Sequence, residues 1–427
     1  MKESKYNIHL LHNDRNVVFN SRTTATAVID EEALALFKHL ETGNTVEKSA
    51  LALQMREVGF LIDEETDELQ QLEMQYYFGK YGQSGISLVI APTMYCNFAC
   101  PYCYEGVHSD DVMSQETQGE VMALIERFAK EGQNVFITWF GGEPLLCKET
   151  IYKMSEEMLK ICQREAVEYS AEIITNGYLL DVDTVKNLSR YRVETVQVTI
   201  DGMPETHNSR RKLRNKCNSP TFEKILENII MAKSFGLEMA VRISVDKQTV
   251  GELEQILDLM IENDLGEDVY LGRIEGNTDG ARGCECDCLR ASEYAKTSLN
   301  FENMKLQRGL KTQYPSPIRT NCGAGYQHSF VIDTKGYLYK CWNDIGIIEK
   351  SVGNIQNFDD IERNPNRNYS SWMVWSPFHY TKCRECKVLP ICMGGCQYEG
   401  QSIGLPNCES WKHEIEGFIK LKCEEVM

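Results

Sequence analysis

The first 84 residues alternate short strand-like runs with amphipathic helical runs. The run NIHLLH and the run VVFN flank the turn NDRN and predict a β-hairpin. Asp30 stands where it can cap a helix over residues 31–43. A second helix over residues 46–58, the short strand GFLI and an acidic helix over residues 63–78 follow. The pattern predicts a small α/β module with a winged-helix-like arrangement.

From residue 85 to about residue 275, apolar β-rich runs alternate with amphipathic helices. The predicted strands are SLVIAPT, NVFITWF, AEIITNG, TVQVTID, MAVRISVD and VYLGRI. The predicted helices between them include SQETQGEVMALIERFAKE, TIYKMSEEMLKICQRE, TFEKILENIIMAKSFG and TVGELEQILDLMIEND. Six β-α units predict a parallel sheet, either a partial barrel or a doubly wound sheet. Functional loops should follow the carboxyl ends of its strands.

After residue 280 the pattern changes to short strands, turns and closely spaced cysteines. All seventeen cysteines follow residue 85, and none precedes it. The irregular last part is unlike a region held by an apolar core alone, so we expect metal clusters to supply much of its folding free energy. The sequence thus predicts three parts: a module over residues 1–84, a sheet domain over 85–280 and a cysteine-rich region over 281–427.

Composition and charge narrow the classes of function. The net charge is 45 minus 63, or −18, which disfavours a nucleic-acid partner and suits a basic peptide. No apolar stretch is long enough for a membrane span, and the polar start lacks a signal-peptide pattern, so we expect no membrane association and a cytoplasmic location. Thiols stay reduced in that compartment. The cysteines are therefore expected to bind metal or clusters.

Cys96, Cys100 and Cys103 form a C-x3-C-x2-C loop directly after the first predicted strand of the sheet domain. Three ligands are too few for a closed tetrahedral zinc site, and too many for one disulfide. A cubane iron–sulfur cluster has four irons that each take one outer ligand. Three thiolates would leave the fourth iron open to an exchangeable ligand. A zinc site or buried cysteines remain the alternatives for this loop.

The cysteine loop resembles the signature of the radical S-adenosylmethionine (SAM) enzymes. That resemblance implies an α/β fold with a partial (β/α)6 TIM barrel. It also implies a 4Fe-4S cluster whose open iron chelates the amino and carboxylate groups of SAM, and an electron that cleaves SAM to a 5′-deoxyadenosyl radical. In this sequence GGEP follows the second predicted strand, TNG the third and TIDG the fourth. These segments resemble those that contact SAM in the family.

The resemblance assigns the SAM contacts to Tyr102, Gly141, Gly142, Glu143, Asn176, Thr199, Asp201 and Arg242. Simpler roles remain open for some of them. GGEP could be an ordinary turn, and Tyr102 could only cover the cluster. Arg242 needs an anion if it is buried, and a structural carboxylate such as Asp246 could supply it.

The tail contains the block C-x2-C-x5-C-x3-C, which resembles the SPASM extension of radical SAM enzymes that modify peptides and proteins. The resemblance implies two auxiliary 4Fe-4S clusters, so three clusters in all. The outer cluster would use Cys383, Cys386, Cys392 and Cys408. The inner cluster would use Cys322, Cys341 and Cys396. The segment HSFVIDTKGYLYKCW before this block predicts a hairpin that turns at TKG, as in the extension.

The inner set departs from fully ligated relatives, which have a further cysteine about six residues after the first. This chain has His328 there. The fourth position could be open to a substrate thiolate, could be filled by His328, or could be reached by a cysteine of the tract GCECDC. The members of that tract are Cys284, Cys286 and Cys288, to which we assign no family role. The remaining thiols are interpreted as buried or incidental: Cys147, Cys162, Cys217 and Cys423.

One position bears on the choice of subfamily. Relatives that oxidise a cysteine or serine of a sulfatase carry an aspartate directly after the residue that matches Cys341, where it takes the substrate proton. Here that residue is Trp342, which argues against the activity. Asp344 lies only two residues further, so the exclusion is incomplete.

Together these features predict a peptide maturase that installs a crosslink in a ribosomally made precursor peptide. We favour a thioether, with a carbon–carbon or ether bond as the alternative. Units like residues 1–84 bind the leader of the precursor in such maturases, although a packing role is also open. An electron donor such as flavodoxin or ferredoxin is implied, and we identify no catalytic side chain. The competing hypotheses are a peptide epimerase, a sulfatase-maturing-type oxidase, and a zinc-binding structural or regulatory protein.

Overall fold

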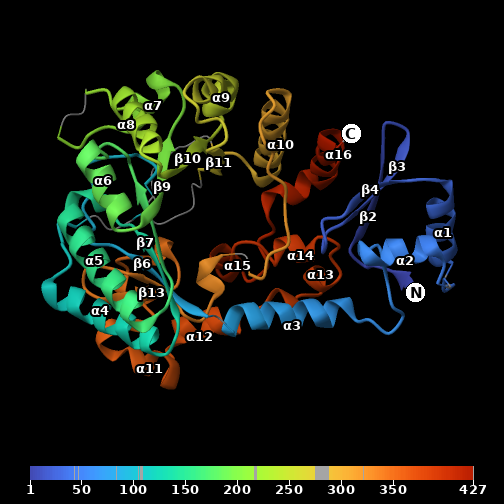
Figure 1. The fold of residues 1–427 in the computed structure, drawn as a ribbon, viewed down its shortest axis with the longest axis horizontal. Helices are drawn as coiled ribbons and strands as arrows, with labels where there is room; N and C mark the ends of the chain where they lie inside the picture. Colours follow the sequence, from blue (N-terminus) through green and yellow to red (C-terminus); the bar gives the residue numbers. More distant parts are fainter. Residues whose placement is uncertain are drawn as a thin grey trace. The chain divides into compact units, whose positions relative to one another are not determined.

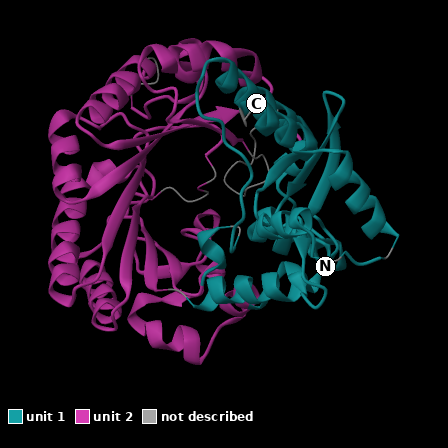
Figure 2. Ribbon diagram, turned by 45° about the vertical axis from the view of Figure 1, so that its right-hand side comes forward, with its two compact units in different colours: residues 1–82, 291–326, 374–427 teal, residues 83–290, 327–373 magenta. Residues whose placement is uncertain are grey.

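The computed structural model describes residues 1–42, 44–46, 48–82, 84–103, 105, 109–215, 219–274, 288–320 and 322–426. Figure 1 shows the order of the helices and strands. The chain divides into two compact units (Figure 2). Unit 1 comprises residues 1–82, 291–326 and 374–427, and unit 2 comprises residues 83–290 and 327–373. In the described part of the chain, no helix has the length and apolar character needed to cross a membrane.

Unit 2 is built on one large sheet with a run of parallel strands. These are β6 (Gly85–Ile90), β7 (Asn134–Trp139), β8 (Tyr169–Thr175), β9 (Val193–Ile200), β10 (Glu238–Val245) and β11 (Val269–Arg273). All six match the predicted strands. They pair in chain order without a reversal, which is the order of a barrel-type sheet and not that of a doubly wound sheet.

Helices cover the outer side of this sheet, as the magenta part of Figure 2 shows. They are α4 (Gln115–Lys130), α5 (Lys148–Glu165), α6 (Val182–Arg190), α7 (Pro204–Arg210), α8 (Phe222–Ser234) and α9 (Leu253–Glu262). The four helices named from the sequence are confirmed as α4, α5, α8 and α9. Alternate strand residues such as Val196, Val198 and Ile200 are fully buried under them, because successive side chains of a strand point to opposite faces.

The predicted hairpin at TKG is confirmed. It consists of β12 (Ser329–Ile332) and β13 (Tyr337–Tyr339), and Gly336 has a positive φ of 78° in the turn. The sequence did not predict that β12 pairs in parallel with β6 and so extends the large sheet, which continues to β14 (Gly353–Asn354). Every residue of β12 is buried, as expected for a strand covered on both faces.

The N-terminal part of unit 1 contains the predicted elements. The strands β2 (Asn7–His12), β3 (Arg15–Asn20) and β4 (Thr26–Ile29) form an antiparallel sheet. Short strands β1 (Lys2–Glu3) and β5 (Leu61–Ile62) pair separately, and the helices are α1 (Glu31–Glu41), α2 (Ala50–Glu57) and α3 (Glu68–Tyr81). Asp30 caps α1 by accepting from the Ala33 N–H at 2.9 Å, as predicted. The winged-helix arrangement stays a prediction.

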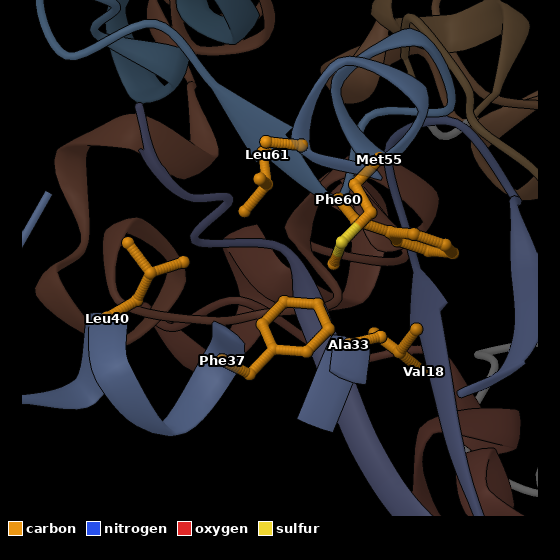
Figure 3. Packing of buried hydrophobic residues seen from close by; sticks show 8 residues of the cluster. Val18, Ala33, Phe37, Leu40, Met55, Phe60 and Leu61 are labelled. Carbon is orange, nitrogen blue, oxygen red and sulfur yellow. The ribbon is translucent and has the colours of Figure 1, made fainter. Parts of the chain in front are cut away.

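Both faces of the sheet in unit 1 are covered. Val18 lies in the cluster drawn in Figure 3, with Ala33 and Phe37 of α1. Its neighbours Val17 and Phe19 point to the opposite face, where they pack with residues of the tail: Val388, Ile391, Ile419 and Cys423. The N-terminal sheet and the cysteine-rich tail therefore share one hydrophobic core.

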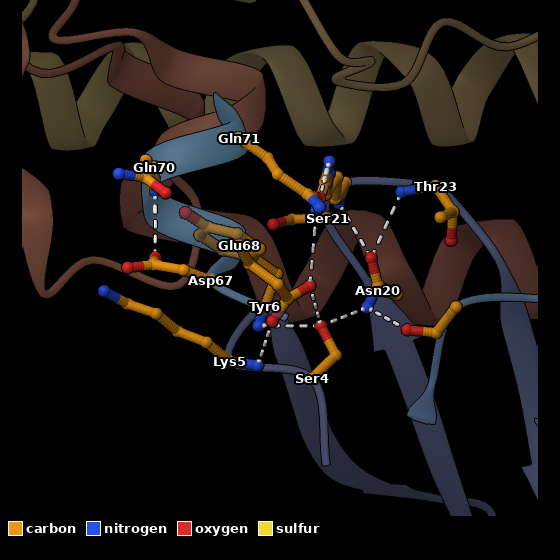
Figure 4. A network of polar contacts seen from close by, with 12 residues as sticks. Ser4, Lys5, Tyr6, Asn20, Ser21, Thr23, Asp67, Glu68, Gln70 and Gln71 are labelled. Atoms are coloured by element: carbon orange, nitrogen blue, oxygen red, sulfur yellow. Dashed lines mark hydrogen bonds and ion pairs between the residues drawn. The ribbon is translucent and has the colours of Figure 1, made fainter. Parts of the chain in front are cut away.

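A buried polar network joins the first strands to α3 (Figure 4). The Glu68 carboxylate, which is 5% exposed, accepts from Ser4 Oγ and from the Lys5 N–H, both at 2.8 Å. Asn20 Nδ2 donates to Ser4 Oγ at 3.0 Å. These bonds fix the start of α3 against β1 and β3, because an unsatisfied buried carboxylate would be costly.

The rest of unit 1 is helical. It contains α10 (Ala291–Gln307), α13 (Thr381–Arg384), α14 (Leu389–Cys392), α15 (Gln397–Ile403), a 3-10 turn η9 (Ser410–Glu414) and α16 (Ile415–Val426). The helices α11 (Phe358–Arg363) and α12 (Arg367–Val374) follow β14.

Candidate active site and cysteine clusters

The three-cysteine loop lies beyond the carboxyl end of β6, as predicted. Backbone hydrogen bonds hold it against the segment that follows α7: Ala99 N–H donates to the Lys212 carbonyl at 2.9 Å, and Arg214 N–H donates to the Asn97 carbonyl at 2.7 Å. The Arg214 side chain also donates from Nε to the Cys96 carbonyl at 3.1 Å. A segment more than a hundred residues downstream thus fixes the shape of the cysteine loop.

The thiols of this loop lie in surroundings that disfavour the free thiolate. Burial raises the pKa of Cys96 and of Cys103 to about 12, and it also raises the pKa of Cys100. Such thiols stay protonated at neutral pH unless a metal displaces the proton. The Arg211 guanidinium acts against burial at Cys100, because its positive charge favours the thiolate. None of the described cysteines forms a disulfide.

The glycine pair after β7 packs against the backbone that leads into the cysteine loop. Gly142 N–H donates to the Thr93 carbonyl at 3.2 Å, and Glu143 N–H donates to the Tyr95 carbonyl at 2.9 Å. A Cβ on Gly141 would lie 2.3 Å from the Thr93 oxygen, and one on Gly142 would lie 2.3 Å from the Tyr95 oxygen. Only glycine fits at either position. The pair therefore has a packing role that the sequence did not reveal.

Glu143 is fully buried and links the ends of β7 and β8. Its Oε1 accepts from Thr175 Oγ1 at 2.7 Å and from the Leu145 N–H at 3.0 Å, while its Oε2 accepts from the Asn176 N–H at 2.8 Å. Burial raises the pKa of Glu143, and these three donors act in the opposite direction. Asn176 in turn donates from Nδ2 to Asn97 Oδ1 at 2.8 Å, inside the cysteine loop. Glu143 and Asn176, both predicted from the sequence, thus connect the ends of two strands to the cysteine loop.

Tyr102 and Asp201, both predicted SAM contacts, meet in one buried group. Tyr102 Oη donates a hydrogen bond to Asp201 Oδ2. Arg211 joins them: its Nη1 lies 3.3 Å from Tyr102 Oη and 4.0 Å from Asp201 Oδ1. Arg211 is 7% exposed, and its Nε has no hydrogen-bond partner within the described residues. A buried donor that lacks a partner fits a site for an anionic group of a ligand.

The sequence analysis missed Arg211. It directly follows the short helix α7, whose pattern is too polar to be noticed among the amphipathic helices. One signal was available: Arg210, Arg211, Lys212 and Arg214 stand close together in a strongly acidic chain, about ten residues after Asp201.

Arg242 lies on β10, directly beside Thr199 of β9 in the sheet register. Its guanidinium donates to Ser244 Oγ at 3.0 Å and to the Arg273 carbonyl at 3.1 Å. Asp246, the structural partner considered for it, instead forms an ion pair with Arg210 at 2.6 Å. The structure therefore gives Arg242 neutral acceptors on the sheet rather than that carboxylate.

Glu105 is a second residue that the sequence analysis missed. It is 6% exposed and follows Cys103 by two positions. Burial, together with the negative charge of Glu143, raises the pKa of Glu105 to about 8. Within the described residues its Oε2 has no hydrogen-bond partner. The site thus holds a carboxyl group that is neutral in part at physiological pH.

The four cysteines of the proposed outer cluster converge within unit 1. Cys392 hydrogen-bonds to Cys408. Burial raises the pKa of Cys383, and the nearby charges of Cys408 and Cys386 raise it further. The hydrogen bond from Cys392 lowers the pKa of Cys408, and Lys412 adds to this effect. Cys383 and Cys392 are buried. Four thiols from residues 383 to 408 thus share one locality, as a cluster requires.

The proposed inner set is divided between the two units. Cys322 and Cys396 belong to unit 1, and Cys341 belongs to unit 2. Cys322 lines a cavity of about 10 Å³ with Tyr76, Thr320, Gly325, Trp375 and Gln397. Cys341 precedes a 3-10 turn, Trp342–Asp344, in which Asp344 is buried and the Trp342 ring stacks on Phe140 at 5.9 Å. This indole therefore contacts the residue that precedes the glycine pair in the sequence.

His328 is engaged elsewhere in unit 2. Its Nε2 lies 3.0 Å from Glu362 Oε1, and its ring packs edge-on against Phe128 at 5.1 Å. This arrangement gives no support to His328 as the fourth ligand of the inner set. Among the other cysteines, Cys162 and Cys423 are buried and Cys147 and Cys288 are half-buried. Cys217, Cys284 and Cys286 lie outside the described residues.

Across the described residues, no three His, Cys, Asp or Glu side chains are grouped tightly enough to bind one metal ion. Ligands of a single zinc ion must all lie about 2.0–2.3 Å from it. A cubane cluster binds each thiolate through a different iron, so its ligands stand further apart. The spacing of these cysteines is therefore compatible with clusters.

Comparisons with known proteins find relatives of this chain. The model of the radical SAM superfamily matches residues 90–260. A cysteine-type anaerobic sulfatase-maturating enzyme of Clostridium perfringens is 24% identical over 342 residues, which cover 73% of this chain and 89% of that protein. A serine-type counterpart of Bacteroides thetaiotaomicron is 35% identical over 151 residues, which cover 34% of this chain and 35% of that protein.

Two solved structures share the fold. The structure of native anSMEcpe with bound AdoMet and the Cp18Cys peptide has a TM-score of 0.62 at 20% identity, and the match covers 80% of this chain and 98% of that one. The structure of Streptococcus suis SuiB bound to the precursor peptide SuiA has a TM-score of 0.56 at 15% identity, with 96% and 98% covered. The second likeness extends over nearly all of this chain.

Proposed function

Since residues 90–260 form a radical SAM domain, this chain is a radical SAM enzyme that acts on a peptide or protein substrate, and we propose that it installs a crosslink in a ribosomally made precursor peptide. The bond we favour is a thioether, with a carbon–carbon or ether bond as the alternative. The observation that carries the choice of a crosslink over sulfatase maturation is Trp342, whose indole cannot accept a proton at the position after Cys341.

Cys96, Cys100 and Cys103 would hold the 4Fe-4S cluster of the domain, and the buried polar groups around them fit a zwitterionic ligand. When bound, the cluster and SAM together supply a 5′-deoxyadenosyl radical. We propose that the partnerless Nε of Arg211 faces the carboxylate of SAM. Tyr102, Asn176, Thr199, Asp201 and Arg242 would form the remaining contacts.

The residues of the chain contribute by positioning. Glu143 connects the ends of two strands through three hydrogen bonds, so it fixes the loops that frame the site. The glycine pair allows the β7 loop to bond directly to the backbone before Cys96. A rigid frame of this kind holds a reacting group close to one target hydrogen atom and keeps water away.

The position about six residues after Cys322, where fully ligated relatives have a further cysteine, holds His328, and this supports the thioether. We propose that Cys322, Cys341 and Cys396 leave one ligand position of an inner 4Fe-4S cluster for a substrate thiolate. The contact between His328 and Glu362 supports an open position over a histidine ligand. Cys383, Cys386, Cys392 and Cys408 would hold the outer cluster, which would make three clusters in all.

We propose that residues 1–84 bind the leader of the precursor. Both faces of the sheet β2–β3–β4 are covered, so a peptide could join it only at an edge strand. Addition at an edge uses backbone hydrogen bonds, so it depends little on the sequence of the peptide. The likeness to SuiB supports this role, because it extends over more of the chain than the likeness to anSMEcpe does.

Maturation of a sulfatase is the second candidate, and two observations favour it. The cysteine-type sulfatase-maturating enzyme of Clostridium perfringens matches over 89% of its length, and Asp344 stands two residues after Trp342. Asp344 is buried on the same short turn, where it could serve as the proton acceptor.

The test is anaerobic incubation of the reconstituted enzyme with SAM, a low-potential reductant such as reduced flavodoxin or ferredoxin, and either a cysteine-containing precursor peptide or a sulfatase peptide. A crosslink removes two hydrogen atoms from the precursor, blocks fragmentation between the joined residues, and, for a thioether, consumes one alkylatable thiol. Epimerisation leaves the mass unchanged. An aldehyde in the sulfatase peptide, detected with a hydrazide reagent, would instead establish the second candidate.

A further inference from the structure

Lys412 lies beside the outer cysteine set. It stands in η9, four residues after Cys408, and its backbone N–H donates to the Glu409 carbonyl at 3.2 Å. This turn returns the side chain toward the cysteines, so that Nζ donates to Cys408 Sγ at 3.6 Å. Cys386 also forms a side-chain hydrogen bond with Lys412. The ammonium group therefore contacts two of the four thiols.

Water screens this contact only weakly. Lys412 is half-buried, and Cys383 and Cys392 of the same set are 5% and 4% exposed. Charges that interact away from bulk water and salt keep more of their Coulomb energy. A lysine ammonium is positive throughout the neutral pH range.

A positive charge next to cluster sulfurs has a definite effect on electron affinity. Reduction adds one negative charge to an iron–sulfur cluster, and net charge, hydrogen bonds to sulfur and solvent exposure set the reduction potential. An ammonium hydrogen-bonded to two ligand sulfurs stabilises the reduced state more than the oxidised one. The net charge of −18 on the whole chain acts in the opposite direction.

We propose that Lys412 is a positioning residue of the outer cysteine set, which raises the reduction potential of the cluster bound there through its contacts with Cys386 and Cys408. The inference rests on the proposed function, because it requires that Cys383, Cys386, Cys392 and Cys408 hold a 4Fe-4S cluster. A raised reduction potential makes the outer cluster a stronger acceptor for the electrons that the substrate releases as it is oxidised.

Lys382 is the matched comparison for this lysine. Its charge also acts on Cys383 and Cys408, but the side chain is exposed, so salt and water screen it. Lys412→Met removes the charge and keeps an apolar stem of similar length. Lys412→Arg keeps both the charge and the N–H donors.

The test is a redox titration of the reconstituted full-length protein, followed by electron paramagnetic resonance. Cys96, Cys100 and Cys103 are replaced by alanine in every sample, so that only auxiliary clusters contribute to the signal. For Lys412→Met we expect the ratio of reduced to oxidised outer cluster at a fixed potential to fall at least about tenfold, a midpoint about 59 mV more negative for one electron. Lys412→Arg should stay close to the parent, and Lys382→Met should shift less than Lys412→Met.

Iron and sulfide analysis separates a failure of the proposed auxiliary clusters from a failure of the role proposed for Lys412. If the parent protein binds no iron once the first three cysteines are gone, the auxiliary clusters of the proposed function are refuted, and this inference with them. If iron is complete and Lys412→Met has the parent midpoint, or if Lys382→Met shifts as much, only the role of Lys412 is refuted. Should Lys412→Met lose iron, Lys412→Gln, which keeps a donor without charge, replaces it in the same comparison.

Discussion

Arg211→Met should strongly destabilise unit 2. The guanidinium lies 4.0 Å from Asp201 Oδ1, and both side chains are buried. Two unit charges at that distance interact by about 4 kcal/mol when the effective dielectric constant is about 20. Removing one partner of a buried pair typically costs about 3–5 kcal/mol, because the other charge is left uncompensated. We therefore expect a loss of about 3–5 kcal/mol in the free energy of unfolding.

The measurement is urea unfolding of the reconstituted protein under anaerobic conditions, followed by tryptophan fluorescence. Arg192→Met is the control, because Arg192 forms an exposed ion pair with Glu194 at 3.3 Å that should contribute under about 1 kcal/mol. Asp201→Asn, alone and combined with Arg211→Met, completes a double-mutant cycle. Equal losses for Arg211→Met and Arg192→Met, or strictly additive effects in the cycle, would refute the reasoning.

Three further outcomes are expected. Gly142→Ala should reduce the iron content, since its Cβ would meet the Tyr95 oxygen at 2.3 Å, whereas Gly119→Ala, with nothing within 4 Å, should leave iron unchanged; equal iron in both would contradict this. Lys80→Met should remove a pH dependence from the stability of the protein, because burial lowers the pKa of Lys80 to about 8 and the unfolded parent therefore binds more protons than the folded parent between pH 8 and 10.5. Over that range the parent should gain up to about 3 kcal/mol relative to the variant in urea unfolding, whereas the bond from Lys80 Nζ to the Trp375 carbonyl at 2.7 Å is lost in the variant at every pH; a constant difference between the two proteins would disprove it. His328→Ala should keep the full iron content, and a loss measured by iron analysis would make His328 a ligand.

The elements of unit 2 were predictable because their signals are local. Each strand from β6 to β11 is a short apolar run, and the helices between them carry regular apolar stripes. The Asp30 cap is also local, since it needs only a short polar side chain before an apolar helix. The cysteine spacings are local too, which is why the loop from Cys96 to Cys103 was found directly.

The rest depends on pairings between distant segments. Ser329 pairs with Ser87 across the sheet, but the run HSFVI indicates only a strand and does not name its neighbour. Arg211 and Glu105 reach the site because the fold brings a polar helix end and a loop onto the cysteines. The glycine pair was noticed, yet its packing against Thr93 and Tyr95 depends on where the first strand ends.

The placement of cations explains how so acidic a chain could hold clusters that are themselves negatively charged. Thiolate-ligated clusters buried in protein require nearby positive charge or hydrogen-bond donors, because uncompensated buried charge is costly. Arg211 acts electrostatically on Cys100 in unit 2, and Lys412 bonds to Cys408 in unit 1. The three-cysteine loop in unit 2 and the outer cysteine set in unit 1 thus each have a buried or half-buried cation beside them. If these cations had no such role, replacing them would change neither the iron content nor the reduction potentials, and the Lys412 variants above measure both quantities at one of the two sites.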